Sequence, residues 1–550
     1  MPYQPSAQQQ AVIHSDAPVT VVLGGAGCGK TTTAAAAARR RLDSLEESRQ
    51  AARAITPAGA APALPASQKV LFVSFSRTAV SQILDRSANV LGPQQRQVDV
   101  VTFHGLAWRI LSSFGRHYGH PYPLRVQSAA EASLAAAAFP GMTYADLLPA
   151  ATKLLQAPTV RDYYNRRYGT VICDEFQDTS DVEWTFLQSV APGAQRILLG
   201  DPNQCIYAGM KKIDPYDRVA QATALPGAIE VTLPPLSHRD PTGVLPAAAL
   251  AAMERRFGDA AIAHAVTNGR IVLHHAPPAE LCSGVASVIA AERLANKTVS
   301  VFTHTHAATA ELSTGLTQAG IVHEQVGFTE AFGDALQAQF ALLRWAIERE
   351  SGGRAALAAY VHSISRGSRE KQIPPKIVSR GLPKFEEALK VATLAIRTAA
   401  GPPPDFEQLL SRIKALHTNL GFPRGEETWN EANRQFERAL RLLERGGTMT
   451  DVAAQVEEVR GSTLVGARSS RPKPVQLMNL HQTKGREADA TVLMLQPDEF
   501  HGYEGEPFAT GSRLLYVCLT RARERAHIVV PDSGTVHRLW KPLIDACTPA

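Results

Sequence analysis

The sequence predicts an α/β protein with two parallel-sheet units, each interrupted by a helix-rich insertion. Three observations lead to this prediction. Short β-branched and apolar runs alternate with helical patterns in two separate parts of the chain. A glycine-rich loop joins one such run to a strong helix-forming stretch near the start. Helix-rich stretches interrupt the alternation twice, so each sheet is expected to form from two separated pieces of sequence.

The first unit begins with the apolar run 19–23, which we expect to be a buried strand. An alanine-rich helical pattern follows from Thr32 and gives way to an Ala/Pro-rich surface insertion before Gln68. Further strands are expected at 70–75, 98–103, 171–173 and 197–199. Strands that alternate with helices form parallel sheets, so ligand-binding groups should lie at their carboxyl ends.

The second unit begins near Pro234, and its strands are expected at 270–274, 298–303, 475–480, 491–495 and 527–530. The expected segments are 1–113 and 170–233 for the first unit, 114–169 for its insertion, 234–335 and 472–550 for the second unit, and 336–471 for its insertion.

Composition sets limits on the protein class. The 550 residues are 45% hydrophobic and carry a net charge of +6, a mildly basic balance that is compatible with a polyanionic partner. No basic segment followed by an apolar one marks a signal peptide, and no apolar run is long enough for a membrane span. The six cysteines form no C-x-x-C pair, which argues against a zinc or iron–sulfur site and for a reducing, cytoplasmic compartment.

The glycine-rich loop fits the phosphate-binding pattern G-x-x-x-x-G-K-[ST]. Its glycines allow backbone N–H groups to approach phosphate oxygens without interference from Cβ atoms, and the following helix N-terminus adds partial positive charge. Lys30 is expected to reach the β- and γ-phosphates, and the Thr31 hydroxyl to hold Mg²⁺. The loop consists of Gly24, Gly25, Ala26, Gly27, Cys28, Gly29, Lys30 and Thr31. The sequence therefore predicts binding of a nucleoside triphosphate.

Two adjacent acids follow the expected strand 171–173. A P-loop enzyme needs one carboxylate at such a strand end to hold Mg²⁺ and a second to orient or deprotonate the attacking water. Asp174 fits the first role and Glu175 the second.

Eight motifs then occur in an order that resembles UvrD/Rep/PcrA-type superfamily 1 DNA helicases, over nearly the whole chain. They are GGAGCGKT, FSRTA, TFHGLAWRIL, DEFQD, GDPNQCIY, SHR, LHQTKGRE and YVCLTRAR. The resemblance implies two RecA-like P-loop NTPase domains, and the use of ATP and Mg²⁺. It implies a compact member of the family, because both insertions are short.

The resemblance also assigns roles in the nucleotide site. Gln8 matches the glutamine that reads the adenine edge, and a solvated N-terminal glutamine is the alternative. Gln204 matches the γ-phosphate sensor, Arg239 and Arg521 match two arginine fingers, and Glu487 matches the ribose ligand. The implied nucleotide-binding set is Gln8, the loop residues Gly24 to Thr31 named above, Thr32, His238, Arg239, Glu487 and Arg521.

The resemblance also assigns residues to nucleic-acid binding. The family positions that line a single strand are matched by Phe75, Thr102, His104, Tyr207 and His481. Aromatic and histidine side chains stack on any base, so sequence preference should be weak. The implied partners are single-stranded DNA and DNA junctions, and the implied direction of travel is 3′→5′.

Two departures from the family pattern bear on function. His238 stands where the family usually has Tyr, so adenine stacking should be weaker. After Tyr207 the family usually shows a Trp-Arg pair, whereas this chain has 208–212, AGMKK. The two lysines could supply phosphate contacts or form a solvated pair.

The sequence predicts an ATP-dependent helicase that couples hydrolysis to duplex unwinding, and three alternatives stay open. They are a DNA-stimulated translocase with little unwinding, such as the motor component of a repair or antiphage system; a nucleotide-gated scaffold; and an RNA helicase. The basic stretch 365–384 of the second insertion could contact duplex or a protein partner, or be a solvated face.

Overall fold

The computed structural model describes residues 4–548, apart from the gaps that follow. The gaps are 56–67, 76–79, 81–82, 84–86, 136–140, 207, 326–328, 349–351, 366–369, 403, 423–424, 466–472, 498–508 and 537. The chain divides into two compact units. We call Met1–Phe103, Leu155–Val326 and Ser469–Ala550 the sheet unit, and His104–Leu154 with Gly327–Arg468 the helical unit.

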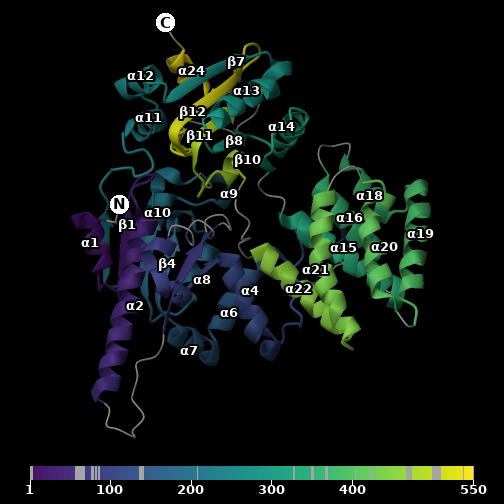
Figure 1. Ribbon diagram of the computed structural model, residues 1–550. Helices are drawn as coiled ribbons and strands as arrows, with labels where there is room; N and C mark the ends of the chain where they lie inside the picture. Colours follow the sequence, from purple (N-terminus) through teal and green to yellow (C-terminus); the bar gives the residue numbers. More distant parts are fainter. Residues whose placement is uncertain are drawn as a thin grey trace. The chain divides into compact units, whose positions relative to one another are not determined.

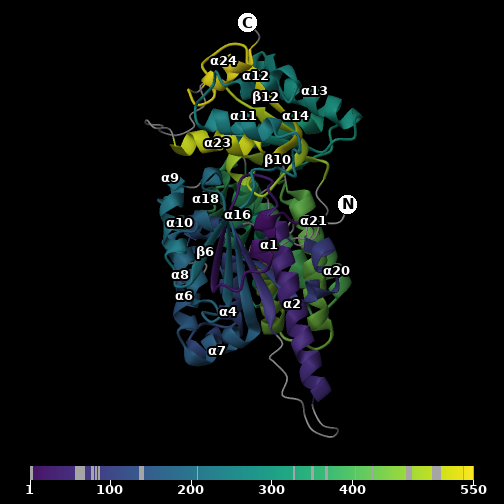
Figure 2. The same cartoon turned by 90° about the vertical axis from the view of Figure 1, so that its left-hand side faces the viewer.

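The sheet unit contains two six-stranded parallel sheets. The first has the order β3 (Val98–Thr102), β2 (Lys69–Ser74), β4 (Tyr168–Asp174), β5 (Gln195–Gly200), β1 (Val19–Leu23) and β6 (Ala228–Thr232). Both faces are covered, as a parallel sheet requires, and α2 (Lys30–Ile55) and α8 (Asp181–Ser189) lie on opposite sides (Figure 2).

The second sheet has the order β7 (Ile271–Ala276), β12 (Ala522–Pro531), β11 (Ala488–Met494), β8 (Val299–Thr303), β10 (Val475–Asn479) and β9 (Glu324–Gln325). Two apolar clusters pack on it, one with Leu515 and Trp540 and one with Val285 and Leu312. Strands from before and after the helical segment 327–468 are thus intermixed within one sheet (Figure 1).

Further helices surround the two sheets. They are α1 (Ala7–Ile13), α7 (Pro158–Arg167), α9 (Ala208–Lys211), α10 (Pro215–Thr223), α11 (Val244–Met253), α12 (Ala260–Thr267), α13 (Leu281–Leu294), α14 (His306–Gln318), α23 (Ala509–Leu519) and α24 (Lys541–Cys547).

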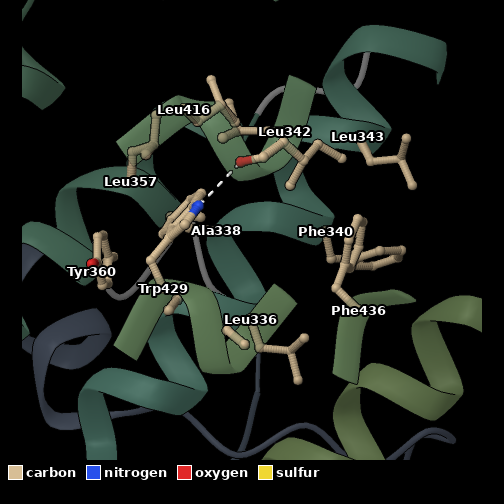
Figure 3. Close-up of a cluster of buried hydrophobic side chains, with 14 of the residues drawn as sticks. Leu336, Ala338, Phe340, Leu342, Leu343, Leu357, Tyr360, Leu416, Trp429 and Phe436 are labelled. Carbon is tan, nitrogen blue, oxygen red and sulfur yellow. Dashed lines mark hydrogen bonds between the residues drawn. The ribbon is translucent and has the colours of Figure 1, made fainter. Parts of the chain in front are cut away.

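The helical unit is built from two stretches of sequence around one apolar core (Figure 3). Trp429 lies fully buried at its centre, where the indole N–H donates to the Ile413 carbonyl at 3.1 Å. Its helices are α4 (Phe103–Phe114, whose first residue ends the sheet unit), α5 (Ala129–Ala135), α6 (Leu147–Leu155), α15 (Thr329–Glu348), α16 (Gly353–Ile364), α18 (Ile373–Val378), α19 (Pro383–Ala399), α20 (Phe406–Asn419), α21 (Glu426–Glu444) and α22 (Met449–Val465).

The predicted fold class is confirmed: the structure has two parallel α/β sheets interrupted by helical sequence. Every strand predicted from an apolar run is present, although β3 ends at Thr102. The edge strands β6 and β9 were not predicted. The six segment boundaries stay a prediction, and the Ala/Pro-rich insertion at 56–67 lies outside the described residues. None of the described helices has the length and apolarity needed to cross a membrane.

Candidate active site

Three neighbouring strands of the first sheet end at the same edge, and each is followed by residues of the predicted nucleotide site. β4, β5 and β1 are adjacent and parallel, so their carboxyl ends lie side by side. The P-loop follows β1, Asp174 ends β4, and Asp201 follows β5. This edge is where a doubly wound sheet binds its ligand.

The loop has the conformation that its glycines predict. Gly27 has φ +78°, and a Cβ there would lie 2.4 Å from the Ser237 hydroxyl oxygen, so only glycine fits. Lys30 lies under the loop, where its Nζ donates to the Gly24 carbonyl at 2.5 Å and the Gly25 carbonyl at 3.1 Å. Burial lowers its pKa, but nearby ionisable groups, among them Cys28 and Asp201, outweigh burial and raise the pKa above its ordinary value. The lysine is therefore a fixed positive charge at the loop.

The two strand-end acids lie next to the loop. The Thr31 hydroxyl is 3.5 Å from an Asp174 carboxylate oxygen, as expected for a hydroxyl and a carboxylate that share one Mg²⁺. Glu175 has a left-handed backbone, φ 59°, which is uncommon for a residue with a side chain and typical of strained functional positions. Burial opposes its ionisation, but Lys484 and Lys30 outweigh burial and hold the pKa of Glu175 below its ordinary value.

Magnesium fits this pair as part of a larger ligand set. Among the described residues, no group of three or more His, Cys, Asp or Glu side chains is arranged to hold a metal ion. Mg²⁺ in phosphate-transfer sites is normally held by one or two protein oxygens together with substrate phosphates and water. Thr31 and Asp174 suit that arrangement, with oxygen ligands only.

Residues beside the second sheet bring arginines to the nucleotide loop of the first. Glu487 and Arg521 immediately precede the neighbouring strands β11 and β12. Arg239 donates to Glu487 at 2.8 Å and also to the Thr520 carbonyl. Arg521 is fully buried and donates to the Gln204 amide oxygen at 2.5 Å, which links the second sheet to the first. Burial, with nearby Arg239, lowers the pKa of Arg521 to about 10, so it stays charged at neutral pH.

These groups surround one cavity of about 370 Å³. Its lining combines the P-loop, the acids of the first sheet and the basic and acidic groups of the second. The lining residues are Gly27, Cys28, Gly29, Lys30, Thr31, Thr32, Ile83, Asp174, Glu175, Gln204, His238, Arg239, Gly485, Glu487, Arg521 and Arg523. Most of the predicted nucleotide-site residues thus line one cavity, whereas Gly24, Gly25 and Ala26 belong to the loop but not to the lining, and Gln8 lies elsewhere.

Gln8 lies on the outer face of α1, exposed to solvent. Its neighbour Gln9 is buried, and its amide donates to the Cys28 carbonyl of the P-loop at 3.3 Å. The Gln9 amide oxygen also accepts from the Ser6 backbone N–H at 2.9 Å, which completes a capping box at the start of α1. The structure therefore favours Gln9 over Gln8 as the glutamine that contacts the nucleotide loop. The capping pattern S-x-x-Q, formed by Ser6 and Gln9, is the sequence signal that distinguishes the two glutamines.

Three further residues of the site were not predicted. The Tyr516 hydroxyl accepts from the Ala26 N–H of the P-loop at 3.1 Å. Lys484 contacts the Asp178 carboxylate and lies 3.5 Å from a Glu175 oxygen, and burial lowers its pKa to about 8. Arg523 donates to Glu487 at 2.7 Å. All three lie inside motifs quoted for the family resemblance, but only their contacts place them at the site, and Arg523 also lines the cavity.

The predicted nucleic-acid residues stay a prediction, and those that the structure describes belong to both compact units. Phe75 lies against Phe103, with ring centroids 5.0 Å apart, and Thr102 is buried at the end of β3. His104 belongs to the helical unit, where its ring stacks on Tyr144 at 3.8 Å. The other two positions were Tyr207, which lies outside the described residues, and His481, whose side chain also lies outside them.

Lys211, one of the two lysines after Tyr207, has a defined place. Its Nζ lies 4.3 Å from the centroid of the Phe75 ring and pairs with Glu183 at 2.8 Å. It also donates to the Asp178 carbonyl at 3.1 Å. The positive charge of Lys211 is therefore directed to protein groups, which corrects the expectation of a solvated pair for this lysine.

Comparisons with known proteins agree with this site. Residues 8–210 match a family model described as an AAA domain. ATP-dependent DNA helicase UvrD1 of Mycobacterium tuberculosis is 23% identical over 287 residues, covering 38% of this chain and 35% of that protein. One component of the ATP-dependent helicase/nuclease of Streptococcus sanguinis is 34% identical over 73 residues, covering 13% of this chain and 6% of that protein. Over the matched residues, the chain is thus similar to proteins named as ATP-dependent DNA helicases. The matched region spans about a third or less of these relatives' length.

Proposed function

We propose that this protein is an ATP-driven motor that moves along single-stranded DNA and couples hydrolysis to duplex unwinding. The observation that carries the proposal is the link between the two sheets at one cavity of about 370 Å³. The P-loop, Asp174 and Glu175 follow or end strands of the first sheet, and Arg521 precedes β12 of the second. Arg239 lies in the segment between β6 and α11 and is bound to Glu487, which precedes β11 of the second sheet. A nucleotide site that is formed by residues of both sheets can couple the state of the bound nucleotide to the distance between the two sheets.

The residues suggest how hydrolysis proceeds. With nucleotide bound, Lys30 would exchange its loop carbonyls for β- and γ-phosphate oxygens. Thr31 and Asp174 would hold Mg²⁺, which would neutralise charge on those phosphates. Glu175, ionised at neutral pH, accepts a proton from the attacking water. Arg521 and Arg239 stabilise the charge that develops on the γ-phosphate, an effect worth roughly 10³–10⁵ in rate for such arginines.

Gln204 is suited to sense the γ-phosphate. Its amide oxygen accepts from Arg521 at 2.5 Å, and its amide nitrogen donates to Asp201 at 2.6 Å. One side chain thus bridges an arginine of the second sheet and an acid of the first. Loss of the γ-phosphate would change the charge next to Arg521 and loosen this bridge. We propose that this event releases the two sheets for the next step along the strand.

A motor that translocates with little unwinding is the second candidate. It is favoured by the sequence 208–212, which lacks the family's Trp-Arg pair, and by the contacts of Lys211. Since Lys211 covers Phe75 and pairs with Glu183, it contributes less to gripping a nucleic-acid strand. Weak gripping lowers the force available at a duplex junction without preventing ATP turnover.

The proposal is tested by steady-state ATP hydrolysis with and without oligodeoxythymidylate, at low and high salt. We expect DNA to raise turnover many-fold, and high salt to reduce this because phosphate contacts release counterions. Lys30→Ala should abolish turnover, whereas Lys541→Ala, on exposed α24, should leave it unchanged. Turnover that is absent or indifferent to nucleic acid would contradict the motor and favour a nucleotide-gated scaffold.

The strand-separation step has its own assay. A 3′-tailed and a 5′-tailed duplex are compared under conditions where ATP turnover is fast. Unwinding of the 3′-tailed duplex alone supports a 3′→5′ helicase, and turnover without strand separation supports the translocase. Competition between single-stranded DNA and RNA of equal length decides which polymer the motor follows.

A further inference from the structure

The hydroxyl group of Tyr516 is a feature of the site that the proposed hydrolysis steps do not use. Its oxygen accepts a hydrogen bond from the Ala26 N–H of the P-loop at 3.1 Å. Tyr516 lies on α23, is 5% exposed and packs in an apolar cluster that also contains Ala26 and Leu515. Because this cluster packs on the second sheet, the contact joins a helix of the second sheet to the P-loop of the first.

The hydrogen bond holds one particular peptide group of the loop, the one between Gly25 and Ala26. The carbonyl oxygen of this group accepts from the Lys30 Nζ at 3.1 Å, and its N–H donates to Tyr516. The peptide bond is trans, so its C=O and N–H point in opposite directions. Lys30 and Tyr516 therefore hold opposite edges of one peptide plane.

One of these two contacts is lost when a nucleotide binds. In the proposed mechanism, Lys30 leaves the loop carbonyls for phosphate oxygens. Gly25 has no Cβ to oppose rotation of the peptide plane, so another contact is needed to fix it. Among the described residues, Tyr516 supplies the side-chain hydrogen bond that stays on this plane. Rotation of the plane would displace Gly27, the first loop residue that lines the cavity.

We infer that Tyr516 is a positioning residue, which fixes the P-loop for nucleotide binding through the Ala26 N–H. The inference rests on the proposed function, since it requires that the P-loop binds a nucleotide. Tyr516 does not line the cavity, so it acts through the loop backbone. Burial, with Asp201 nearby, raises the pKa of Tyr516 to about 12, so its oxygen is a neutral hydroxyl acceptor at neutral pH.

Tyr516 and Arg521 should therefore have different kinetic signatures, although one helix leads to both. Arg521 follows α23 and donates to Gln204, which is next to the γ-phosphate in the proposed mechanism. Loss of the Tyr516 hydroxyl should weaken nucleotide binding and leave the chemical step unchanged. A merely structural role would instead lower the fraction of folded enzyme, and hence kcat, without a selective effect on binding.

The experiment compares Tyr516→Phe, which removes the hydroxyl and keeps the ring, with Tyr168→Phe. The Tyr168 hydroxyl is also buried and donates to Asp99 at 2.8 Å, but it lies at the amino end of β4, opposite the nucleotide edge. The Kd of a fluorescent ATP analogue, the KM and kcat for ATP, and hydrogen exchange of the P-loop peptide are measured. In Tyr516→Phe we expect Kd and KM to rise about five-fold, the loss expected for one hydrogen bond, with kcat at saturating ATP close to wild type. Exchange should rise in the P-loop peptide, and Tyr168→Phe should change none of these quantities.

Three results in a wild-type chain that binds nucleotide would overturn the inference. They are an unchanged Kd and unchanged P-loop exchange in Tyr516→Phe, a loss of kcat with binding retained, and an equal rise of Kd in Tyr168→Phe. A wild-type chain that binds no nucleotide would refute the proposed function itself, and this inference with it. Hydrogen exchange in the rest of the chain shows whether each variant keeps its fold.

Discussion

At the residue scale, one step of sequence separates two glutamines with different environments. Gln9 is buried against the P-loop, whereas Gln8 is exposed on the same helix. A helix turns by about 100° per residue, so neighbouring positions face different surroundings. The pattern QQQ in the sequence cannot distinguish them, and only the capping box with Ser6 fixes the register.

Gln9→Ala should raise the KM for ATP and weaken discrimination against GTP. The loss of one side-chain hydrogen bond costs about 1 kcal/mol, which corresponds to roughly five-fold in KM. Gln8→Ala is the matched control and should leave both quantities unchanged. The measurement is steady-state kinetics with both nucleotides, with thermal melting to confirm folding. If Gln8→Ala had an effect equal to or larger than that of Gln9→Ala, Gln8 rather than Gln9 would be the residue that recognises the adenine base.

Lys484→Met should change the pH dependence of turnover. Burial raises the pKa of Glu175, and Lys484 is the largest of the opposing influences that hold it below its ordinary value of 4.5. Removal of this cation leaves burial dominant, so the pKa of Glu175 rises. The acidic limb of the kcat profile should then move to higher pH, because Glu175 acts in its ionised form.

The readout is the position of this limb, since the size of kcat also responds to changes other than the ionisation of Glu175. The exposed substitution Lys541→Met is the control and should leave the limb in place. An acidic limb that stays put or moves to lower pH in Lys484→Met would show that Lys484 does not control the ionisation of Glu175.

At the scale of elements, α5, α15 and α22 of the helical unit are joined by a buried charge network. Arg460 is 1% exposed and donates to Glu131 at 2.5 Å, and it lies 3.5 Å from Asp334. Glu457 lies 3.6 Å from it on the same helix. The guanidinium thus connects a helix of the segment 104–154 with two helices of the segment 327–468.

Arg460→Met should destabilise the helical unit by about 3–5 kcal/mol, because it leaves buried Asp334 without its cation and leaves Glu131 and Glu457 with Arg125 alone. Hydrogen exchange should also rise in α5, which depends on this network for its contact with α22. The measurements are urea unfolding and hydrogen exchange by mass spectrometry. Arg438→Met, on the exposed face of α21, controls for loss of one arginine. Equal stability of the two variants would show that Arg460 is not needed to join these helices.

Among the strands, the sequence predicts correctly those that are apolar along their whole length. Apolar runs such as 19–23 predict strands because a central parallel strand is buried on both faces and must be apolar throughout. β6 lies at the sheet edge and carries the exposed residues Ile229 and Glu230, so it lacks that pattern. β9 has only two residues and is specified by pairing with β10. These two edge strands therefore depend on neighbours that the local sequence does not reveal.

At the scale of the molecule, the sequence predicted one nucleotide site shared by two sheets. The P-loop residues and Asp174 could be predicted because backbone geometry and metal binding restrict the residue types. Arg239 and Arg521 could be assigned only through the resemblance, since an isolated arginine carries no signal of its own. Tyr516 and Lys484 were missed because their roles depend on contacts between distant parts of the chain.

The compact units also differ from what sequence order suggests. The two helical insertions were expected as separate additions to separate sheets. The segments 104–154 and 327–468 instead form one compact unit, with the Arg460 network inside it. A contact between side chains more than three hundred residues apart, Glu131 and Arg460, gives no local signal in a single sequence.

The most direct test of the central claim, that both sheets supply one catalytic site, compares Arg521→Ala with Arg525→Ala. Arg521 faces the cavity through Gln204, whereas Arg525 lies within β12 and pairs with Glu292 at 2.7 Å. Binding of a fluorescent ATP analogue and DNA-stimulated turnover are measured for both. We predict that Arg521→Ala binds nucleotide within a few-fold of wild type but loses roughly 10³-fold or more in kcat, with Arg525→Ala unchanged. Turnover of Arg521→Ala within a few-fold of wild type would contradict the shared site.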